Sequence, residues 1–233
     1  MQIPIRLFKE MKENGRKRIK KPWPTKAAME QVYKMKLWGG PRSDFYSGAG
    51  SHRPEIVQPY INAVITFLKS FDNPLTVCDL GCGDFNVGSN LVQYTKKYVA
   101  ADIVGDLIER NKERFKEENL EFICLDITAD NLPYGNCVIL RQVFQHLSNG
   151  EVQSIVDKLS SFKYVILTEH VPEGAFTPNK EIISGQGTRL KKQSGIDLLA
   201  PPFNLKVLEE RLLLSTLLTE GEGVINTTLY IFS

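Results

Sequence analysis

The sequence predicts an α/β fold in which the strands of a mostly parallel sheet alternate with helices. Three observations support this prediction. The apolar residues 75–78 run into the glycine-rich turn 79–83, a second β-type run covers residues 98–103, and a third covers residues 120–127. Each run is closed by an acid, and the first two acids are separated by roughly twenty residues, as a βαβ unit requires. Together the three runs indicate parallel strands that end at one edge of a sheet.

The remaining elements follow from apolar spacing along the chain. Before the first strand, residues 54–70 place apolar side chains at helical intervals, which predicts a helix packed on the sheet. At the other end, two β-rich runs joined by the glycine-containing turn 219–223 predict an antiparallel hairpin. The other expected helices are 86–97, 106–118 and 149–160, the other strands are 136–140 and 164–169, and the hairpin strands are 205–214 and 224–232.

The turn at residues 79–83 indicates the kind of ligand. Asp79 precedes the first glycine by two positions, as in S-adenosylmethionine sites, whereas dinucleotide sites need G-x-G-x-x-G and carry their acid on the next strand. We expect Asp79 to face a cationic ammonium. Gly81 and Gly83 have no Cβ, so the backbone can turn tightly and pass close to the methionine part of such a ligand.

The acids that end the next two runs complete the pattern. Asp102 stands where a βαβ unit places its ribose-binding carboxylate, which can accept hydrogen bonds from both ribose hydroxyls. Asp126 ends the third run, where an adenine amino group can be met.

With these motifs, residues 54–233 resemble the class I S-adenosylmethionine-dependent methyltransferases. The resemblance implies a Rossmann-like seven-stranded sheet with helices on both faces and a C-terminal antiparallel hairpin. Phe85 departs from the commonest glycine pattern of the family. The implied cofactor contacts are Asp79, Gly81 and Gly83 to the methionine moiety, Asp102 to the ribose, Ile103 to the adenine face, and Asp126 with the backbone of Ile127 to the adenine edge; Gln142, at a strand end, is expected to contact cofactor or substrate.

The end of the fourth strand bears on the reaction class. It lacks the [DNS]-P-P-[YFW] motif of nucleobase amino methyltransferases, and Leu140 and Arg141 cannot supply the carboxylates of a magnesium site. Residues 143–147 fit the V-[LF]-x-H-[LI] pattern of small-molecule O- and C-methyltransferases. His146 is therefore the first candidate for the base that removes a hydroxyl proton, with a core histidine that orients the loop as the alternative. Glu169 and His170 are competing candidates.

Residues 38–52 predict a lid over the cofactor, with an ordinary flexible linker as the alternative. Tyr46, Ser51 and His52 would then reach the substrate or the methionine carboxylate. The block also resembles the N-terminal segment of methyltransferases from bacterial surface-polysaccharide clusters. We accordingly divide the chain into a basic arm and lid, residues 1–53, and a methyltransferase domain, residues 54–233.

Charge is unevenly distributed. The net charge is +2, yet residues 1–37 hold eleven Lys or Arg against three Glu, so the remainder is net acidic. A basic arm can bind an anionic partner such as RNA, or can be a solvated arm or exposed helix face. Arg189, in the long connection 171–199, is a candidate for gripping a phosphate or carboxylate of the substrate, with a solvated basic turn as the alternative.

Composition argues against a membrane-spanning protein and a zinc protein. The 233 residues suit one α/β domain with an appendage, and no stretch approaches the roughly 20 apolar residues of a membrane span, so a cytoplasmic location is expected. Cys78, Cys82, Cys124 and Cys137 lack zinc-site spacing and are expected to be reduced packing residues, without a bound metal.

The sequence therefore predicts an S-adenosylmethionine-dependent enzyme that O-methylates a small anionic metabolite, such as a nucleotide-activated sugar or a phosphorylated surface-polysaccharide precursor. Two alternatives stay open: an RNA methyltransferase that uses the basic arm, and a non-catalytic cofactor-binding subunit of a methyltransferase complex.

Overall fold

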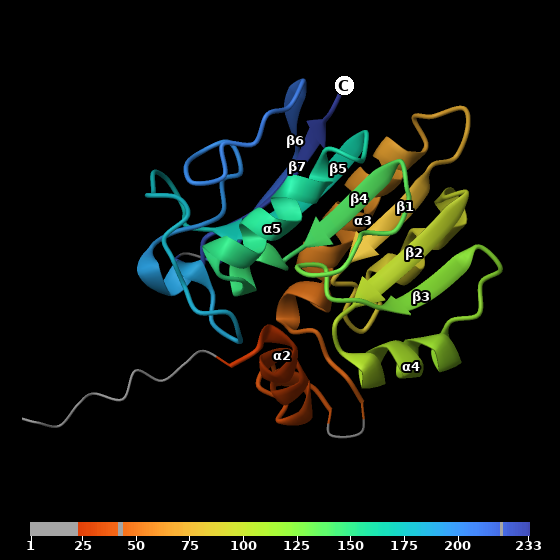
Figure 1. Cartoon of the computed structure of the whole chain (residues 1–233), viewed down its shortest axis with the longest axis horizontal. Coiled ribbons are helices and arrows are strands. Elements are labelled where there is room, and N and C mark those ends of the chain that lie inside the picture. Colours follow the sequence, from red (N-terminus) through yellow and green to blue (C-terminus); the bar gives the residue numbers. More distant parts are fainter. Residues whose placement is uncertain (1–22, 42–43, 220) are drawn as a thin grey trace, which may run out of the picture.

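One sheet of seven strands organises the chain, in the order β3-β2-β1-β4-β5-β7-β6 (Figure 1). The computed structural model of the protein describes residues 23–41, 44–219 and 221–233. Strands β1 to β5 pair in parallel, and β7 lies antiparallel between β5 and β6. The predicted methyltransferase-type sheet with its C-terminal hairpin is confirmed. The strands are β1 (Thr76–Leu80), β2 (Lys97–Asp102), β3 (Leu120–Cys124), β4 (Cys137–Arg141), β5 (Tyr164–Val171), β6 (Glu209–Leu217) and β7 (Val224–Ile231).

Helices cover both faces of this sheet. On one face, α3 (Pro54–Leu68) and α4 (Gly105–Arg114) pack on alternate strand residues such as Val77 and Ile139. On the other face, α5 (Asn149–Leu159) packs on the residues between them, such as Cys78 and Val138. The period-two alternation of the strands thus creates two apolar cores. Strands β1, β2, β4 and β5 are almost entirely buried, so their ends are the parts left accessible to a ligand.

Local sequence explains where the helices begin. Pro54 opens α3 at a position where its missing N–H costs nothing. Ser148 caps α5: its side chain accepts the N–H of Glu151, whose carboxylate in turn accepts the N–H of Ser148. The predicted start of this helix at Asn149 is confirmed.

The helix expected over residues 86–97 is wrong. That segment forms two short 3₁₀ turns, Gly88–Asn90 and Val92–Tyr94, before β2 begins at Lys97. The side chains of Ser89 and Asn90 both donate to the carbonyl of Asn86, and such local bonds compete with helix formation.

The first hairpin strand begins later than expected from residues 205–214. Leu205 donates its N–H to the carbonyl of Leu198 at 2.8 Å, so the chain at this point still belongs to the preceding loop. Pairing with β7 is established only from Glu209, which lies opposite Ile231.

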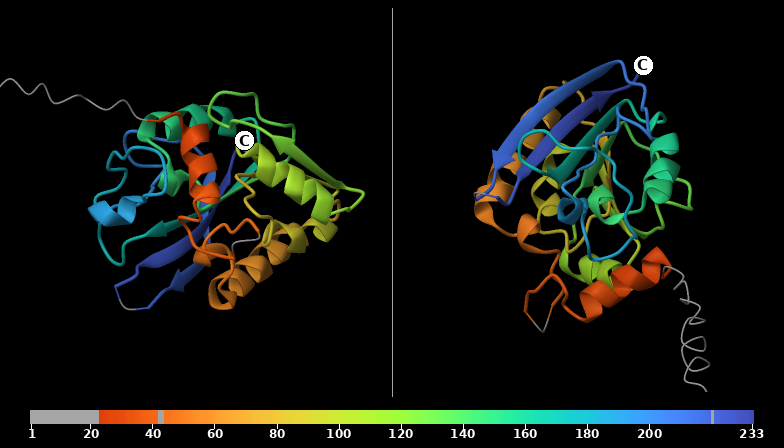
Figure 2. Two further views of the ribbon diagram at one scale, coloured as in Figure 1. Left: turned by 90° about the horizontal axis from the view of Figure 1, so that it is seen from below. Right: turned by 90° about the vertical axis from the view of Figure 1, so that its left-hand side faces the viewer.

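The structure describes only the last part of the basic segment 1–37, which the sequence predicts to be a solvated arm, an exposed helix face or a binding site for an anionic partner. Residues 1–22, which hold most of its basic side chains, lie outside the described residues. Thr25–Lys34 form helix α2, which buries Val32 and Tyr33. Figure 2 shows this helix lying across one end of the sheet. The division of the chain at residue 53 stays a prediction.

The cysteines differ in environment. Cys78 and Cys137 are buried as expected, but Cys124 is exposed because it ends the edge strand β3, and Cys82 is half-buried in the glycine turn. Over the described segments, the helices are too short or too polar to cross a membrane.

Candidate active site

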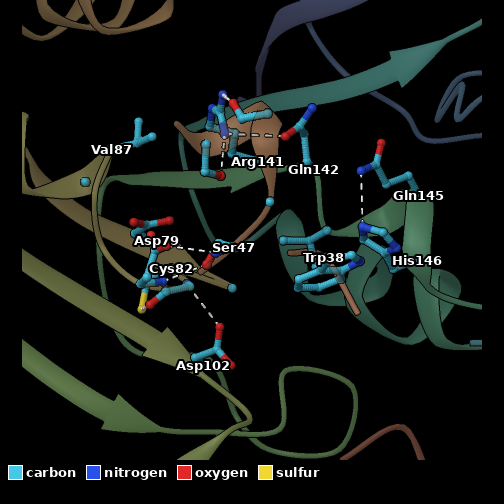
Figure 3. Close-up of a pocket in the computed structure, with 18 of the residues that line it drawn as sticks. Trp38, Ser47, Asp79, Cys82, Val87, Asp102, Arg141, Gln142, Gln145 and His146 are labelled. Atoms are coloured by element: carbon cyan, nitrogen blue, oxygen red, sulfur yellow. Dashed lines mark hydrogen bonds between the residues drawn. The ribbon is translucent and has the colours of Figure 1, made fainter. Parts of the chain in front are cut away.

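A cavity of about 510 Å³ lies at the carboxyl ends of the parallel strands. Its floor is formed by the ends of β1, β2 and β4, and its roof by α2, Trp38 and residues 47–51. In open α/β sheets this edge is where ligands bind, because the loops that follow the strands diverge there. Figure 3 shows the side chains that point into the cavity.

Asp79, near the end of β1, presents a buried carboxylate at the cavity. It is 6% exposed, and one of its oxygens accepts a hydrogen bond from Tyr98 at 3.0 Å. Burial raises the pKa of Asp79 to about 7, although the Tyr98 hydroxyl and the charge of Arg141 oppose the shift. A cation beside Asp79 would favour its ionised form, which suits the ammonium expected from the sequence.

The glycine turn has the conformation that its sequence predicts. Gly81 and Gly83 have φ values of 83° and 57°, which L side chains rarely adopt. A Cβ on Gly81 would overlap Val143, and one on Gly83 would overlap the Ser47 hydroxyl. The turn therefore approaches both the loop after β4 and the roof of the cavity.

Asp102, at the end of β2, is held by the backbone. Its two oxygens accept the N–H groups of Gly83 at 3.1 Å and Val104 at 3.0 Å. Burial raises the pKa of Asp102, and these hydrogen bonds oppose the rise. Each carboxylate oxygen keeps a second lone pair, so the residue can still accept from ribose hydroxyls. Ile103, Asp126 and Ile127 also line the cavity.

These residues fit S-adenosylmethionine. Because β1, β2 and β3 are neighbours in the sheet, Asp79, Asp102 and Asp126 follow one another along the cavity wall, as the predicted contacts to ammonium, ribose and adenine require. The assignments of Asp79 to the ammonium, Asp102 to the ribose and Asp126 to adenine remain predictions. One of the Asp126 oxygens accepts from both the N–H and the hydroxyl of Thr128, at 2.9 and 2.7 Å, which fixes the side chain.

Two polar residues lie at the end of β4, Arg141 as its last residue and Gln142 directly after it. Gln142 has a φ of 57° and donates its N–H to Thr168 at 2.7 Å. A Cβ on Gly50 would overlap the Gln142 side chain, so the roof lies directly on this residue. Arg141 lines the cavity beside Gln142 and donates to Gly50 and Ser51 of the roof.

His146 lies in the 3₁₀ turn Phe144–His146 and lines the cavity. Its Nδ1 is 3.2 Å from the carbonyl of Gly187, an acceptor, so Nδ1 carries the proton and Nε2 keeps a lone pair. Burial lowers the pKa of His146 to about 4, so the ring is neutral at neutral pH. Trp38 lies 5.0 Å from it between ring centroids, and Figure 3 shows the two rings side by side.

Glu169 and Arg189 clamp the loop that carries His146. Glu169 is 3% exposed and accepts the N–H groups of Phe144 and Gln145 at 2.9 and 2.8 Å. Arg189 is 1% exposed and donates to the carbonyls of Phe144 and Leu147, each at 2.7 Å. Both lie behind the cavity wall. The expected roles of Glu169 as a competing base and Arg189 as a substrate grip are therefore corrected to positioning of this loop.

His170 does reach the cavity wall, on β5. Its Nε2 donates to the carbonyl of Glu222 at 2.6 Å, which ties it to the hairpin turn, and burial lowers its pKa. Its lone pair is then on Nδ1. His170 stays a competing base, further along the cavity from the end of β4.

The predicted lid residues separate into two groups. Ser51 lines the cavity, and Ser47 joins it: Ser47 bonds to Tyr33 at 2.9 Å, and its N–H donates to Asp84 at 2.7 Å. Tyr46 and His52 instead stack on each other 4.3 Å apart outside the lining, and His52 bonds to Asp84 at 2.6 Å. Their expected contact with substrate is corrected, because these two rings hold the roof in place.

Sequence reasoning missed several wall residues. Arg141 was considered only as a failed metal ligand, although a charged residue at the end of an apolar strand is itself a signal. Asp84, which is 4% exposed, anchors the roof. Tyr33 lies on α2, which the sequence does not separate from the arm, and Trp38 lies in the predicted lid but was not singled out there. Within the described residues, no group of three or more His, Cys, Asp or Glu side chains is placed to hold a metal ion.

Part of this chain is similar to known methyltransferases. Residues 77–162 match the family model described as a methyltransferase domain. A 92-residue stretch is 34% identical to malonyl-[acyl-carrier protein] O-methyltransferase of Acetivibrio thermocellus, which is 37% of this chain and 32% of that protein. The chain thus matches about a third of the length of this relative.

Solved structures share the fold over a longer span. N-methyltransferase NodS of Bradyrhizobium japonicum, in complex with S-adenosyl-L-homocysteine, superposes with a TM-score of 0.65 at 10% identity, covering 88% of this chain and 98% of that one. Magnesium protoporphyrin IX methyltransferase of Synechocystis, with bound S-adenosylmethionine, superposes with a TM-score of 0.59 at 15% identity, covering 91% and 98%.

Proposed function

We propose that this chain, a class I S-adenosylmethionine-dependent methyltransferase, methylates a hydroxyl oxygen of a small anionic metabolite. The observation that carries the proposal is the roofed cavity, in which His146, Gln142 and Trp38 lie together beyond the glycine turn. A space of about 510 Å³ that also admits the cofactor leaves room for a small acceptor group.

His146 is the proposed base. When bound, S-adenosylmethionine supplies an electrophilic methyl group and leaves as S-adenosylhomocysteine. The chain's task is to orient the acceptor hydroxyl and to take its proton. Nε2 of His146 has the lone pair that can take that proton, and Gly187 fixes the ring through Nδ1. Gln145, whose amide nitrogen is 3.2 Å from Nε2, can exchange this contact for one with the acceptor.

The proposed acceptor class rests on the resemblance of the roof segment to other methyltransferases. Residues 38–52 resemble segments of surface-polysaccharide methyltransferases. This resemblance favours a nucleotide-activated sugar or a phosphorylated precursor as the acceptor, with the reaction taking place in the cytoplasm. Trp38 offers a flat apolar surface on which a sugar or base ring can stack.

The test is the release of S-adenosylhomocysteine from the protein supplied with S-adenosylmethionine and, separately, two acceptor pools. One pool contains nucleotide sugars and phosphorylated metabolites, and the other contains total RNA. Release with the metabolite pool supports the proposal, and fractionation then leads to the acceptor. Release with RNA alone would replace it by the RNA methyltransferase that uses the basic arm. Cofactor binding without release in either pool would favour the non-catalytic subunit.

A further inference from the structure

We propose that Arg141, Tyr60 and Ser51 form a carboxylate-binding subsite at the end of the cavity next to Asp79. The inference rests on the proposed function, because it assigns one polar end of the same cavity. All three residues line the cavity, and they come from β4, α3 and the roof, respectively. The sequence already suggested Ser51 as a contact for the substrate or the methionine carboxylate, whereas Arg141 and Tyr60 had no ligand-binding role assigned.

The guanidinium of Arg141 is held in place, but not all of its hydrogen-bond donors have a partner among the described residues. One terminal nitrogen donates to the carbonyl of Gly50 at 2.6 Å, and the other lies 3.1 Å from the hydroxyl oxygen of Ser51. The guanidinium stacks 4.8 Å from the ring centroid of Tyr60. Its Nε is buried and has no hydrogen-bond partner in the described part of the chain.

A second orphaned group points to the same ligand chemistry. Tyr60 is 2% exposed, and its hydroxyl is buried without a hydrogen-bond partner among the residues that the structure describes. The Ser51 hydroxyl accepts from Arg141 and so keeps its own proton to donate. Two hydroxyl donors and a guanidinium around one space select an acceptor with negative charge.

The charge of Arg141 also lacks a direct partner. Across residues 23–41, 44–219 and 221–233, no carboxylate forms an ion pair with Arg141. Asp79 and Asp84 act on it only through space. A partly buried cation without a bonded anion is costly unless a ligand supplies the charge.

Strand register places Arg141 beside the predicted ammonium position. Asp79 on β1 pairs with Ile139 on β4, and Arg141 is two residues further, so it lies on the same face of the sheet. Asp79 is suited to an ammonium, and Arg141 to a carboxylate. An α-amino acid carries both groups on one carbon, so the pair suits the zwitterionic end of a methionine.

A carboxylate here can come from two sources, the methionine end of the cofactor or an anionic group of the acceptor. The test compares S-adenosylhomocysteine with 5′-methylthioadenosine, which lacks the amino-acid end, by calorimetry on the full chain. If the cofactor supplies the carboxylate, Arg141→Gln should weaken the first ligand about 10- to 100-fold and the second about twofold or less. Tyr60→Phe should show the same selectivity with a smaller loss. Arg211→Gln, in an exposed pair with Glu209, is the matched control.

Inorganic phosphate serves as the probe that separates the sources. Titrated into the protein saturated with 5′-methylthioadenosine, phosphate should bind in an Arg141-dependent manner, since the carboxylate position is then free. If S-adenosylhomocysteine blocks this binding, the cofactor is the source; if phosphate binds equally in its presence, the acceptor is. Equal loss of both nucleosides in Arg141→Gln, or phosphate binding that ignores Arg141, would overturn the subsite. Failure of the wild type to bind either nucleoside would instead refute the proposed function.

Discussion

Two arginines near the end of β4, Arg189 and Arg141, differ in how many of their donors are bonded to the protein. Arg189 donates to four protein acceptors, the carbonyls of Lys180, Phe144 and Leu147 and the side chain of Asn149. Arg141 donates to one roof carbonyl and one hydroxyl at ordinary distances and keeps a buried, unpartnered Nε. Residue type is the same, so the number of acceptors that the fold provides separates a structural arginine from one available to a ligand.

The comparison also separates the two kinds of effect that substitutions should have. Removing Arg189 deprives buried carbonyls of their donors and should act on stability. Removing Arg141 leaves most of the structure bonded and should act on ligand affinity. The predictions below test this separation from the largest expected effect to the smallest.

Arg189→Met should lower the free energy of unfolding by about 3–5 kcal/mol, because several buried acceptors lose a charged donor. Urea unfolding followed by circular dichroism measures this. Arg141→Met is the matched variant and should cost about 1–2 kcal/mol, since it removes the hydrogen bonds to the Gly50 carbonyl and the Ser51 hydroxyl and a longer one to the Gln142 side chain. Equal losses in the two variants would break the comparison.

His146→Ala should lower turnover about 100- to 1,000-fold through loss of the base, while S-adenosylhomocysteine affinity changes by less than about twofold. Steady-state kinetics and calorimetry measure the two quantities. The result sharpens the comparison, because the clamp that includes Arg189 acts by holding this residue. His170→Ala is the control, and retained turnover in His146→Ala would make His170 the better candidate.

Asp102→Ala should weaken S-adenosylhomocysteine binding by roughly 1–3 kcal/mol through lost charge-assisted hydrogen bonds to the ribose. Unlike Arg141→Gln, it should weaken 5′-methylthioadenosine to the same extent, since both ligands keep the ribose. Calorimetric affinities that do not change would rule out the ribose assignment.

The affinity for S-adenosylhomocysteine should depend on pH through Asp79. Its pKa in the free protein is raised to about 7, and only the ionised carboxylate pairs with an ammonium. Affinity should therefore be constant above pH 7 and fall below it, approaching about tenfold per pH unit. Asp79→Asn should bind more weakly with a flat profile, and 5′-methylthioadenosine should show little dependence in either protein. A wild-type profile that stays flat from pH 5 to 8 contradicts the assignment.

Much of the fold was predictable because its signals are local. The spacing of apolar residues or a helix-capping residue predicts each of the parallel strands, α3, α5 and the hairpin. The failures are also physical. The Ser89 and Asn90 side chains divert residues 86–97 from a helix through bonds to the backbone. Helix α2 was missed because its buried face has meaning only against the sheet ends that it covers.

By itself, the sequence determined the sheet, the glycine turn and the carboxylates Asp79 and Asp102 that end neighbouring strands, because residue spacing fixes which strand ends meet. Only the tertiary structure decided which charged and aromatic side chains face the cavity. The cavity is lined by Arg141 and Trp38, whereas Arg189, Tyr46 and His52 lie outside its lining. That choice depends on acceptors and rings contributed by segments distant in sequence, which no local pattern records.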